Sequence, residues 1–126
     1  MSREYIAGED APAPIGPYSP AVRDGRTVYC SGQTPIDPAT GNLIDGDIAA
    51  QTAQVMKNLT AVLKAAGCDW GDVVKTSIFL VDMADFAAVN EVYGTYVGES
   101  KPARSTVAVA ALPRGARVEI DCIARK

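Results

Sequence analysis

The sequence predicts an α+β domain in which two helices pack on one face of a single β-sheet. Two segments carry apolar residues at helical spacing, and six shorter segments are typical of β-strands, in the order β, β, β, α, β, α, β, β. The length of 126 residues fits one core, so residues 1–126 are expected to form a single domain. One sheet is the economical partner against which both apolar helix faces can be buried.

Three short strands are expected near the N-terminus. Residues 3–7 predict the first strand, and the Pro-rich segment APAPIGPYSP that follows is too irregular for a helix or a central strand. Residues 21–23 and 27–31 predict a β-hairpin, because Asp24-Gly25 supplies the positive φ angles of a tight turn. The segment GQTPIDPATGNLIDG is then a loop with three turn signals.

The first helix is expected to begin after the N-cap Asp47 and to end before Gly67, a natural C′ residue. Its apolar stripe advances in steps of 4, 3, 4, 3 and 4 residues. The stripe consists of Ile48, Thr52, Val55, Leu59, Val62 and Ala66. This face should pack on the sheet.

A strand and a second helix follow. Residues 73–81 are rich in β-branched side chains, and alternation places Thr76, Ile78 and Leu80 on one face together with Val74. The second helix is expected from about Met83 to Val97. Its inward face would be formed by Phe86, Val89, Tyr93 and either Tyr96 or Val97.

The segment KPARSTVAVAALPRGARVEIDC predicts a closing hairpin of two strands around a Pro-Arg-Gly turn. Arg104 stands at the start of its first strand, and Glu119 stands in the middle of its second. The two helices leave the other face of the sheet uncovered, with Ala, Val, Thr and Cys expected on it. An uncovered apolar face on so small a protein predicts self-association.

Composition limits the chemistry. Net charge is −3 and no basic run is longer than two residues, which disfavours nucleic-acid binding but leaves open a basic patch assembled by the fold. Histidine is absent, so Ser-His-Asp and Cys-His schemes and His-based metal sites are removed. Three cysteines without a CxxC spacing (Cys30, Cys68 and Cys122) indicate buried small residues, not a disulfide frame or a zinc site.

Targeting signals are not evident in the sequence. No apolar run approaches the roughly 20 residues that span a bilayer. The segment MSREYIAGEDAPAP lacks the apolar core of a signal peptide. We therefore expect a cytoplasmic protein that does not associate with membranes.

Arg104 and Glu119 each allow two interpretations. Arg104 is either a surface arginine paired with an acid or a carboxylate clamp, with the Ser105 and Thr106 hydroxyls beside it. Glu119 and Asp121 alternate with apolar residues, so they form either the solvated face of a strand or a general acid-base group. Spacing does not decide which of the two carboxylates would be preferred.

Four further residues are candidates for a binding site. Tyr18 lies in a loop, where functional residues concentrate, or it pins that loop to the core. Ser31 and Gly32 end a strand, and Gly32 permits either a turn or a close approach of the backbone to a ligand. Asn90 lies on or near the inward stripe of the second helix, as a ligand contact or as a buried hydrogen-bonding residue.

Six segments carry motifs in a defined order: IGPYSPAV, VYCSGQTPIDPATGNLI, DIAAQTAQVMKNLTAVLKAAG, DVVKTSIFLVDMADFAAVNEVY, KPARSTVAV and LPRGARVEIDCIA. Within them GPYS, SGQ, PARS and VEI form a specific combination. In these motifs and their order the chain resembles the RidA family, also called YjgF, from about Ala11 to Ala124.

The resemblance implies a chorismate-mutase-like α+β fold with one mixed sheet and two helices. It also implies a homotrimer with sheets facing inward, helices outside and three clefts between subunits. The implied activity is that of a 2-iminobutanoate/2-iminopropanoate deaminase. Such an enzyme hydrolyses 2-imino and 2-enamino acids, such as 2-aminoacrylate from pyridoxal-phosphate enzymes, to 2-keto acids and ammonia, with no metal or cofactor.

Matched position by position, Arg104 corresponds to the arginine that holds the substrate carboxylate, and Glu119 to the acid near the reacting water. The substrate-binding positions of the family correspond to Tyr18, Ser31, Gly32, Asn90 and Thr106. Thr106 stands where several members have cysteine, which keeps a hydrogen-bonding atom but loses a thiol. Asp121 stands where many members have glutamate and is treated as secondary.

Other functions stay open at this stage. The same cleft would also suit a sensor that binds 2-keto acids without turnover. Family members are also described as endoribonucleases that inhibit translation, an alternative disfavoured here by the acidic balance and the lack of histidine. A chaperone-like role is neither supported nor opposed by the sequence.

Overall fold

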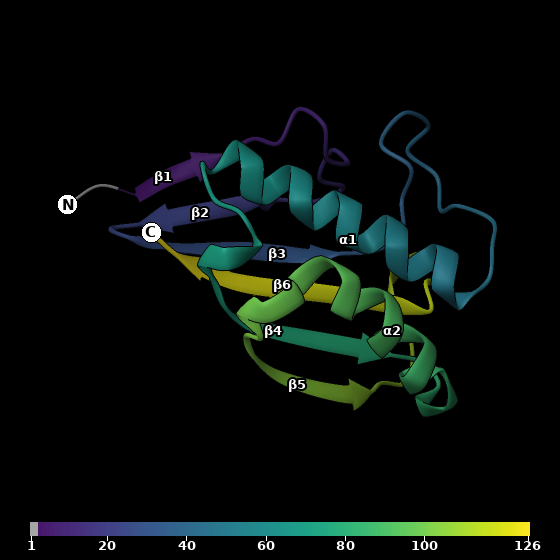
Figure 1. Cartoon of the computed structure of the whole chain (residues 1–126). Coiled ribbons are helices and arrows are strands. Elements are labelled where there is room, and N and C mark those ends of the chain that lie inside the picture. The colour runs from purple at the N-terminus through teal and green to yellow at the C-terminus, as the bar shows by residue number, and fades with distance from the viewer. Residues whose placement is uncertain (1–2) are drawn as a thin grey trace.

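The structure, a computed structural model, describes residues 3–126 (Figure 1). Its strands are β1 (Arg3–Ile6), β2 (Ala21–Asp24), β3 (Thr27–Gln33), β4 (Val73–Leu80), β5 (Ala103–Ala108) and β6 (Val118–Arg125). Its helices are α1 (Ile48–Ala65) and α2 (Phe86–Val97), with short 3₁₀ turns at Trp70–Asp72, Met83–Asp85, Gly98–Ser100 and Pro113–Gly115.

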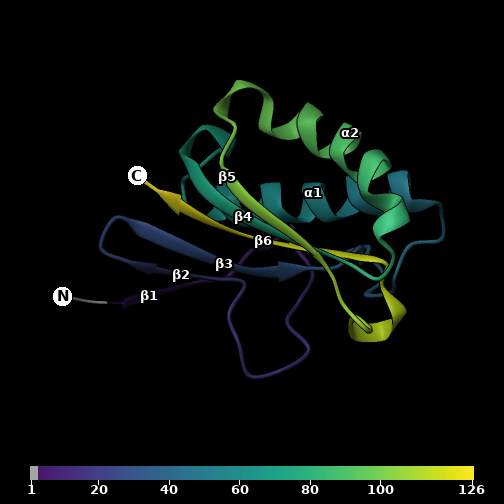
Figure 2. The same ribbon diagram turned by 90° about the horizontal axis from the view of Figure 1, so that it is seen from below.

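The strands form one mixed sheet in the order β1-β2-β3-β6-β4-β5. Neighbouring strands are antiparallel, except that β5 runs parallel to β4 at one edge. Both helices lie on the same side of this sheet, and the loop after β1 bulges toward the other side (Figure 2). The predicted fold class, a single sheet with two helices on one face, is confirmed.

The expected closing hairpin is wrong. β6 pairs with β3 and β4 in the middle of the sheet, whereas β5 pairs only with β4. Val118, Ile120, Cys122 and Ala124 on β6 are at most 1% exposed, while most residues of β5 are exposed. The more apolar strand occupies the centre, because burial and not nearness in sequence decides strand order here.

α1 follows the sequence pattern closely. The Asp47 side chain accepts a hydrogen bond from the Ala50 amide at 2.9 Å, and Gly67 after the helix has a φ of +77°. The predicted stripe is buried from its second residue on: Thr52, Val55, Leu59, Val62 and Ala66. Helix capping depends on local residues, and it is predicted correctly.

α2 begins later than expected, at Phe86, after the 3₁₀ turn Met83–Asp85. Val89, Tyr93 and Val97 are buried as predicted. Phe86 was expected to face inward but is 36% exposed, and its ring lies beside the Arg104 guanidinium at the edge of the sheet. Phe86 packs against a side chain of the edge strand β5 and not against the buried core, so its ring is only partly covered.

β4 contains an irregularity that reverses one predicted position. The register between β4 and β6 shifts between Val73 and Lys75. Val73 therefore joins Thr76 on the buried face, and Val74 is 52% exposed instead of sharing that face. A bulge breaks strict alternation and accounts for the wrong prediction.

The helix-free face of the sheet also differs from expectation. Alternation and register place there not only residues of the expected kinds (Val22, Thr27, Ala103 and Val107) but also Tyr5, Tyr29, Lys75, Ser77, Phe79, Ser105, Glu119, Asp121 and Ile123. Cys30 and Cys122 are free and buried, and they pair with each other across β3 and β6 on the helix side of the sheet. Tyr5, Tyr29 and Val107 remain largely exposed on the helix-free face. Within residues 3–126, neither helix has the length and hydropathy of a membrane span.

Candidate functional site

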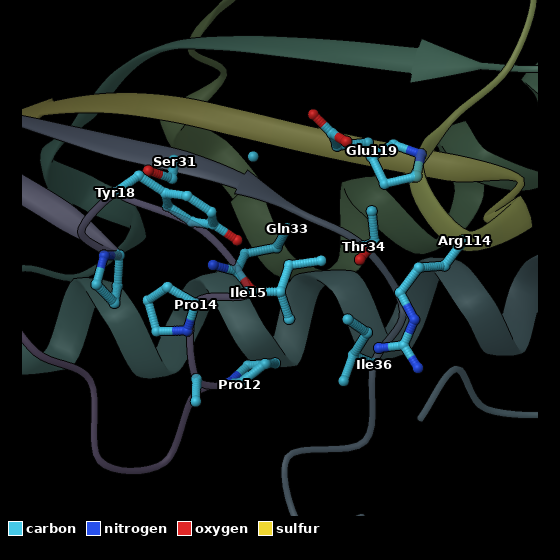
Figure 3. Close-up of a pocket in the computed structure, with 14 residues that line it drawn as sticks. Pro12, Pro14, Ile15, Tyr18, Ser31, Gln33, Thr34, Ile36, Arg114 and Glu119 are labelled. Carbon is cyan, nitrogen blue, oxygen red and sulfur yellow. The ribbon is translucent and has the colours of Figure 1, made fainter. Parts of the chain in front are cut away.

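A pocket of about 370 Å³ opens between the Pro-rich loop, the end of β3 and the start of β6 (Figure 3). Its wall combines apolar residues of the loop with a few polar groups from the strands. The lining residues are Pro12, Ala13, Pro14, Ile15, Tyr18, Pro20, Ser31, Gly32, Gln33, Thr34, Ile36, Pro113, Arg114 and Glu119. Apolar walls with a small number of placed polar groups are typical of small-molecule sites.

Glu119 and Gly32 are in contact within this pocket. The register between β3 and β6 shifts between Cys30 and Gln33, which forms a bulge at Ser31-Gly32. A Cβ atom added to Gly32 would lie 2.3 Å from Glu119 Oε2 and 2.8 Å from its Cδ. The Glu119 carboxyl group therefore occupies the space that any larger residue at position 32 would fill.

Ser31 fastens the Pro-rich loop to the sheet. Its hydroxyl donates a hydrogen bond to the Ser19 carbonyl at 2.7 Å, and its amide donates to the Pro20 carbonyl at 2.9 Å. Tyr18, one residue before Ser19, is half-exposed and its ring forms part of the pocket wall (Figure 3). Ser31 therefore acts on the pocket by positioning the loop that carries Tyr18.

The surroundings of the two acids at the pocket raise the pKa values of both. Burial raises the pKa of Glu119 above its ordinary value, and the neighbouring Asp121 carboxylate raises it further. Burial also raises the pKa of Asp121, while a hydrogen bond from Ser77 and the charge of Lys75 oppose that rise. For Glu119 both causes act in the raising direction, so it keeps its proton to a higher pH than a free glutamate.

Arg104 lies in a different environment, at the edge strand β5. Its Nη1 donates a hydrogen bond to Asn90 Oδ1 at 2.7 Å, and its Cζ lies 5.2 Å and 5.5 Å from the ring centres of Tyr93 and Phe86. None of the ion pairs found among residues 3–126 includes Arg104. Within the described residues the guanidinium is therefore oriented by neutral groups and not by an acid.

Thr106 follows on the same face of β5. Its hydroxyl oxygen is buried and has no hydrogen-bond partner among the described residues. A buried hydroxyl without a hydrogen-bond partner costs free energy unless another molecule supplies that hydrogen bond. Thr106 is thus a polar group available at the same edge as Arg104.

The predicted site residues divide into two groups on opposite faces of the sheet. Arg104 pairs with Thr76, whose hydroxyl is hydrogen-bonded to Tyr93 of α2, so Arg104 is on the helix side. Glu119 lies between the buried Val118 and Ile120 and therefore faces away from the helices. The fold gathers Tyr18, Ser31, Gly32 and Glu119 in the pocket, but it places Arg104, Asn90 and Thr106 elsewhere.

Sequence reasoning missed part of the pocket. Arg114 lines it and is the one cationic residue among the lining residues, yet the sequence marks it only as part of a Pro-Arg-Gly turn. The sequence pattern likewise marks Gln33 and Ile15 only as loop residues, although both line the pocket. A turn next to a strand that carries a candidate acid is the signal that would have directed attention to Arg114. Among residues 3–126, no group of three or more His, Cys, Asp or Glu residues is arranged to hold a metal ion.

Comparisons with known proteins agree over nearly the full chain. A family model described as endoribonuclease L-PSP matches residues 8–126. A mouse (Mus musculus) protein named 2-iminobutanoate/2-iminopropanoate deaminase is 54% identical over 122 residues, which cover 97% of this chain and 90% of the mouse protein. RidA from the Antarctic bacterium Psychrobacter sp. has 46% identity and a TM-score of 0.94, with 98% of this chain and 99% of that chain covered. The YjgF gene product of E. coli has 44% identity and a TM-score of 0.92, with 98% of each chain covered.

Proposed function

Because the chain belongs to the endoribonuclease L-PSP family, which is the YjgF/RidA family, we propose that it is a 2-iminobutanoate/2-iminopropanoate deaminase. It hydrolyses reactive 2-imino and 2-enamino acids to 2-keto acids and ammonia. The mouse, rat, bovine and human relatives that bear this name, at 48–54% identity, support the activity. The proposed substrates include 2-aminoacrylate released by pyridoxal-phosphate enzymes, and the proposed location is the cytoplasm.

The proposed assembly is a homotrimer whose helix-free sheet faces point inward. Two features support it: exposed aromatic and aliphatic residues on that face, and an edge strand β5 whose outer side pairs with no other strand within residues 3–126. In this arrangement Arg104 of one subunit approaches the Glu119 pocket of its neighbour. The assembly therefore completes a site that one chain alone leaves divided between two faces.

The single observation that carries the proposal is the Glu119 carboxyl group, seated against Gly32 in a pocket and with a raised pKa. Imine hydrolysis needs a group that accepts a proton from water and returns it to nitrogen. A carboxyl group whose pKa is raised toward neutrality suits both steps better than one that is fully ionised. Hydrogen-bonding groups of Tyr18, Ser31 and the Gly32 backbone lie around the same space.

The proposed reaction begins with the imine form of the substrate, which an enamine such as 2-aminoacrylate reaches by taking up a proton at C3 and losing one from nitrogen. Arg104 holds the carboxylate through two hydrogen bonds. The Glu119 carboxylate accepts a proton from water as the water oxygen bonds to C2, and the imine nitrogen takes up a proton. The C–N bond of the resulting carbinolamine then breaks, the hydroxyl proton is lost as C=O forms, and Glu119 returns its proton to the departing ammonia.

A coupled assay tests the proposal. A serine dehydratase generates the imine of pyruvate from serine, and the loss of the imine is followed with and without the protein. We expect a faster loss in proportion to protein concentration. A protein that only binds 2-keto acids leaves the rate unchanged, and that result would overturn the proposal.

The family description favours a second candidate, an endoribonuclease. The net charge of −3, the absence of histidine and the single cation in the pocket oppose it. Incubation with a labelled single-stranded RNA separates the two functions. Cleavage of the RNA without any effect on the imine would replace the deaminase proposal.

A further inference from the structure

Arg114 is a second cationic group at the site that the proposed reaction does not use. It belongs to the wall of the Glu119 pocket, and no other lining residue carries a positive charge. None of the ion pairs found among residues 3–126 involves it. A guanidinium beside a carboxyl-containing pocket, with no acid of its own chain as partner, is positioned for an anionic ligand.

The backbone holds Arg114 in an unusual conformation. Its φ of 60° and ψ of 19° lie in the left-handed region, which glycine adopts freely and other residues adopt only at a cost. Pro113 precedes it with a restricted φ, and the Gly115 amide donates to the Leu112 carbonyl at 3.2 Å. The turn therefore fixes the direction in which the arginine side chain leaves the backbone.

The side chain is fixed at its other end as well. Arg114 Nη1 donates a hydrogen bond to the Gly41 carbonyl at 2.7 Å, which ties the turn to the loop between β3 and α1. A guanidinium has several N–H donors in one plane, and this bond uses only one of them. The remaining donors stay available at the pocket wall, near Ile36 (Figure 3).

We infer that Arg114 binds a second carboxylate and extends the substrate range of this site to short 2-imino dicarboxylic acids. The inference rests on the proposed deaminase function, in which Arg104 of a neighbouring subunit holds the first carboxylate. A pocket of about 370 Å³ has room for the longer acid. The reaction is unchanged: the imine carbon gains the oxygen of water, and ammonia leaves. Arg114 is therefore a specificity-determining residue that takes no proton.

The test compares two substrates with matched variants. A flavin amino-acid oxidase generates the imine of pyruvate from alanine, and a second one generates 2-iminosuccinate from aspartate. Arg114→Gln should lower kcat/KM for 2-iminosuccinate roughly 10- to 150-fold, the effect of losing a charge-assisted hydrogen bond, and change the monocarboxylic imine less than about 3-fold. Arg114→Lys should recover part of the loss, since it keeps the charge but not the planar fork.

The control variant is Arg26→Gln, which removes an arginine of the β2–β3 turn, outside the pocket. It should leave both substrates unchanged. Equal losses for both substrates in Arg114→Gln would overturn the inference and indicate that the Gly41 contact shapes the pocket as a whole. Wild-type turnover of the monocarboxylic imine with none of 2-iminosuccinate would also overturn it, while the proposed function would stand.

A binding measurement keeps the inference testable if no imine is hydrolysed. Calorimetric titration with 2-oxoglutarate and with pyruvate uses stable keto acids in place of the imines. Arg114→Gln should weaken 2-oxoglutarate binding selectively and leave pyruvate binding unchanged. Unchanged binding of 2-oxoglutarate would reject Arg114 as a carboxylate site, whatever the fate of the deaminase proposal.

Discussion

The Glu119 pocket and the Arg104 cluster (Arg104 with Asn90, Phe86 and Tyr93) surround their charged groups with opposite environments. Glu119 is half-buried, contacts the backbone at Gly32 and lies beside a second acid, so its pKa is raised. Arg104 is exposed at a sheet edge and is oriented by an amide and two aromatic rings, none of which is charged. The first environment prepares a group for proton transfer, and the second prepares a cation to bind an anion.

The largest effect is expected from removing the acid. Glu119→Gln keeps the shape of the side chain but removes its ability to transfer a proton, so kcat should fall roughly 10²- to 10⁴-fold. Binding of a 2-keto acid should largely persist. Asp121→Asn is the matched control on the same strand face and should lose much less. Equal losses in steady-state kinetics would mean that the two carboxylates act as a pair.

A smaller loss is expected when the acid is kept but displaced. Gly32→Ala places a Cβ where Glu119 Oε2 now lies, so the carboxyl group must move. A displacement of about 1 Å costs on the order of 10²-fold in rate. The control is Gly94→Ala, because an added Cβ there meets no heavy atom within 4 Å and alanine favours the helix. If both variants keep full kcat, the Glu119–Gly32 contact has no role in catalysis.

Substituting the cation should affect substrate binding more than proton transfer. Arg104→Lys retains the charge but replaces a planar fork with a point donor, and roughly 10- to 150-fold in kcat/KM should be lost. Weaker 2-keto acid binding in calorimetry should accompany the loss, with little change in Tm. Normal turnover combined with early melting would identify Arg104 as a structural residue that holds β5 against α2.

The smallest effect concerns stability and pH. The folded protein binds the Glu119 proton more tightly than the unfolded chain, so ionisation of Glu119 destabilises the fold as pH rises through its pKa. Glu119→Gln removes this cost. Its Tm relative to the wild type should therefore be higher at about pH 8 than at about pH 4, in differential scanning calorimetry. A difference that does not vary with pH would contradict the raised pKa.

Much of the fold was predictable because its signals are local. Asp47 and Gly67 mark the ends of α1, and Asp24-Gly25 marks the β2–β3 turn. Strand partners are a tertiary property, which is why the central position of β6 was missed. Val74 was misplaced because a bulge leaves no clear mark in a run of β-branched residues.

The candidate site was predictable as a set of residues but not as an arrangement. Motifs identify Arg104 and Glu119, and alternation assigns each to a face of its own strand only. Their separation on opposite faces follows from the pairing of β5 with Thr76 of β4, which no local pattern contains. The turn of Arg114 directly precedes the strand of Glu119, but the turn pattern alone does not show that this side chain lines a pocket.

The most direct test of the account is whether two inactive variants restore each other. Arg104→Ala and Glu119→Gln are each purified, mixed in equal amounts, unfolded and refolded together, and assayed for imine hydrolysis. If every site takes its arginine from one subunit and its acid from the next, random assembly should give intact sites at about a quarter of the wild-type number. Light scattering should confirm three subunits per particle. Activity no higher than the sum of the two separately refolded variants would contradict a site shared between subunits.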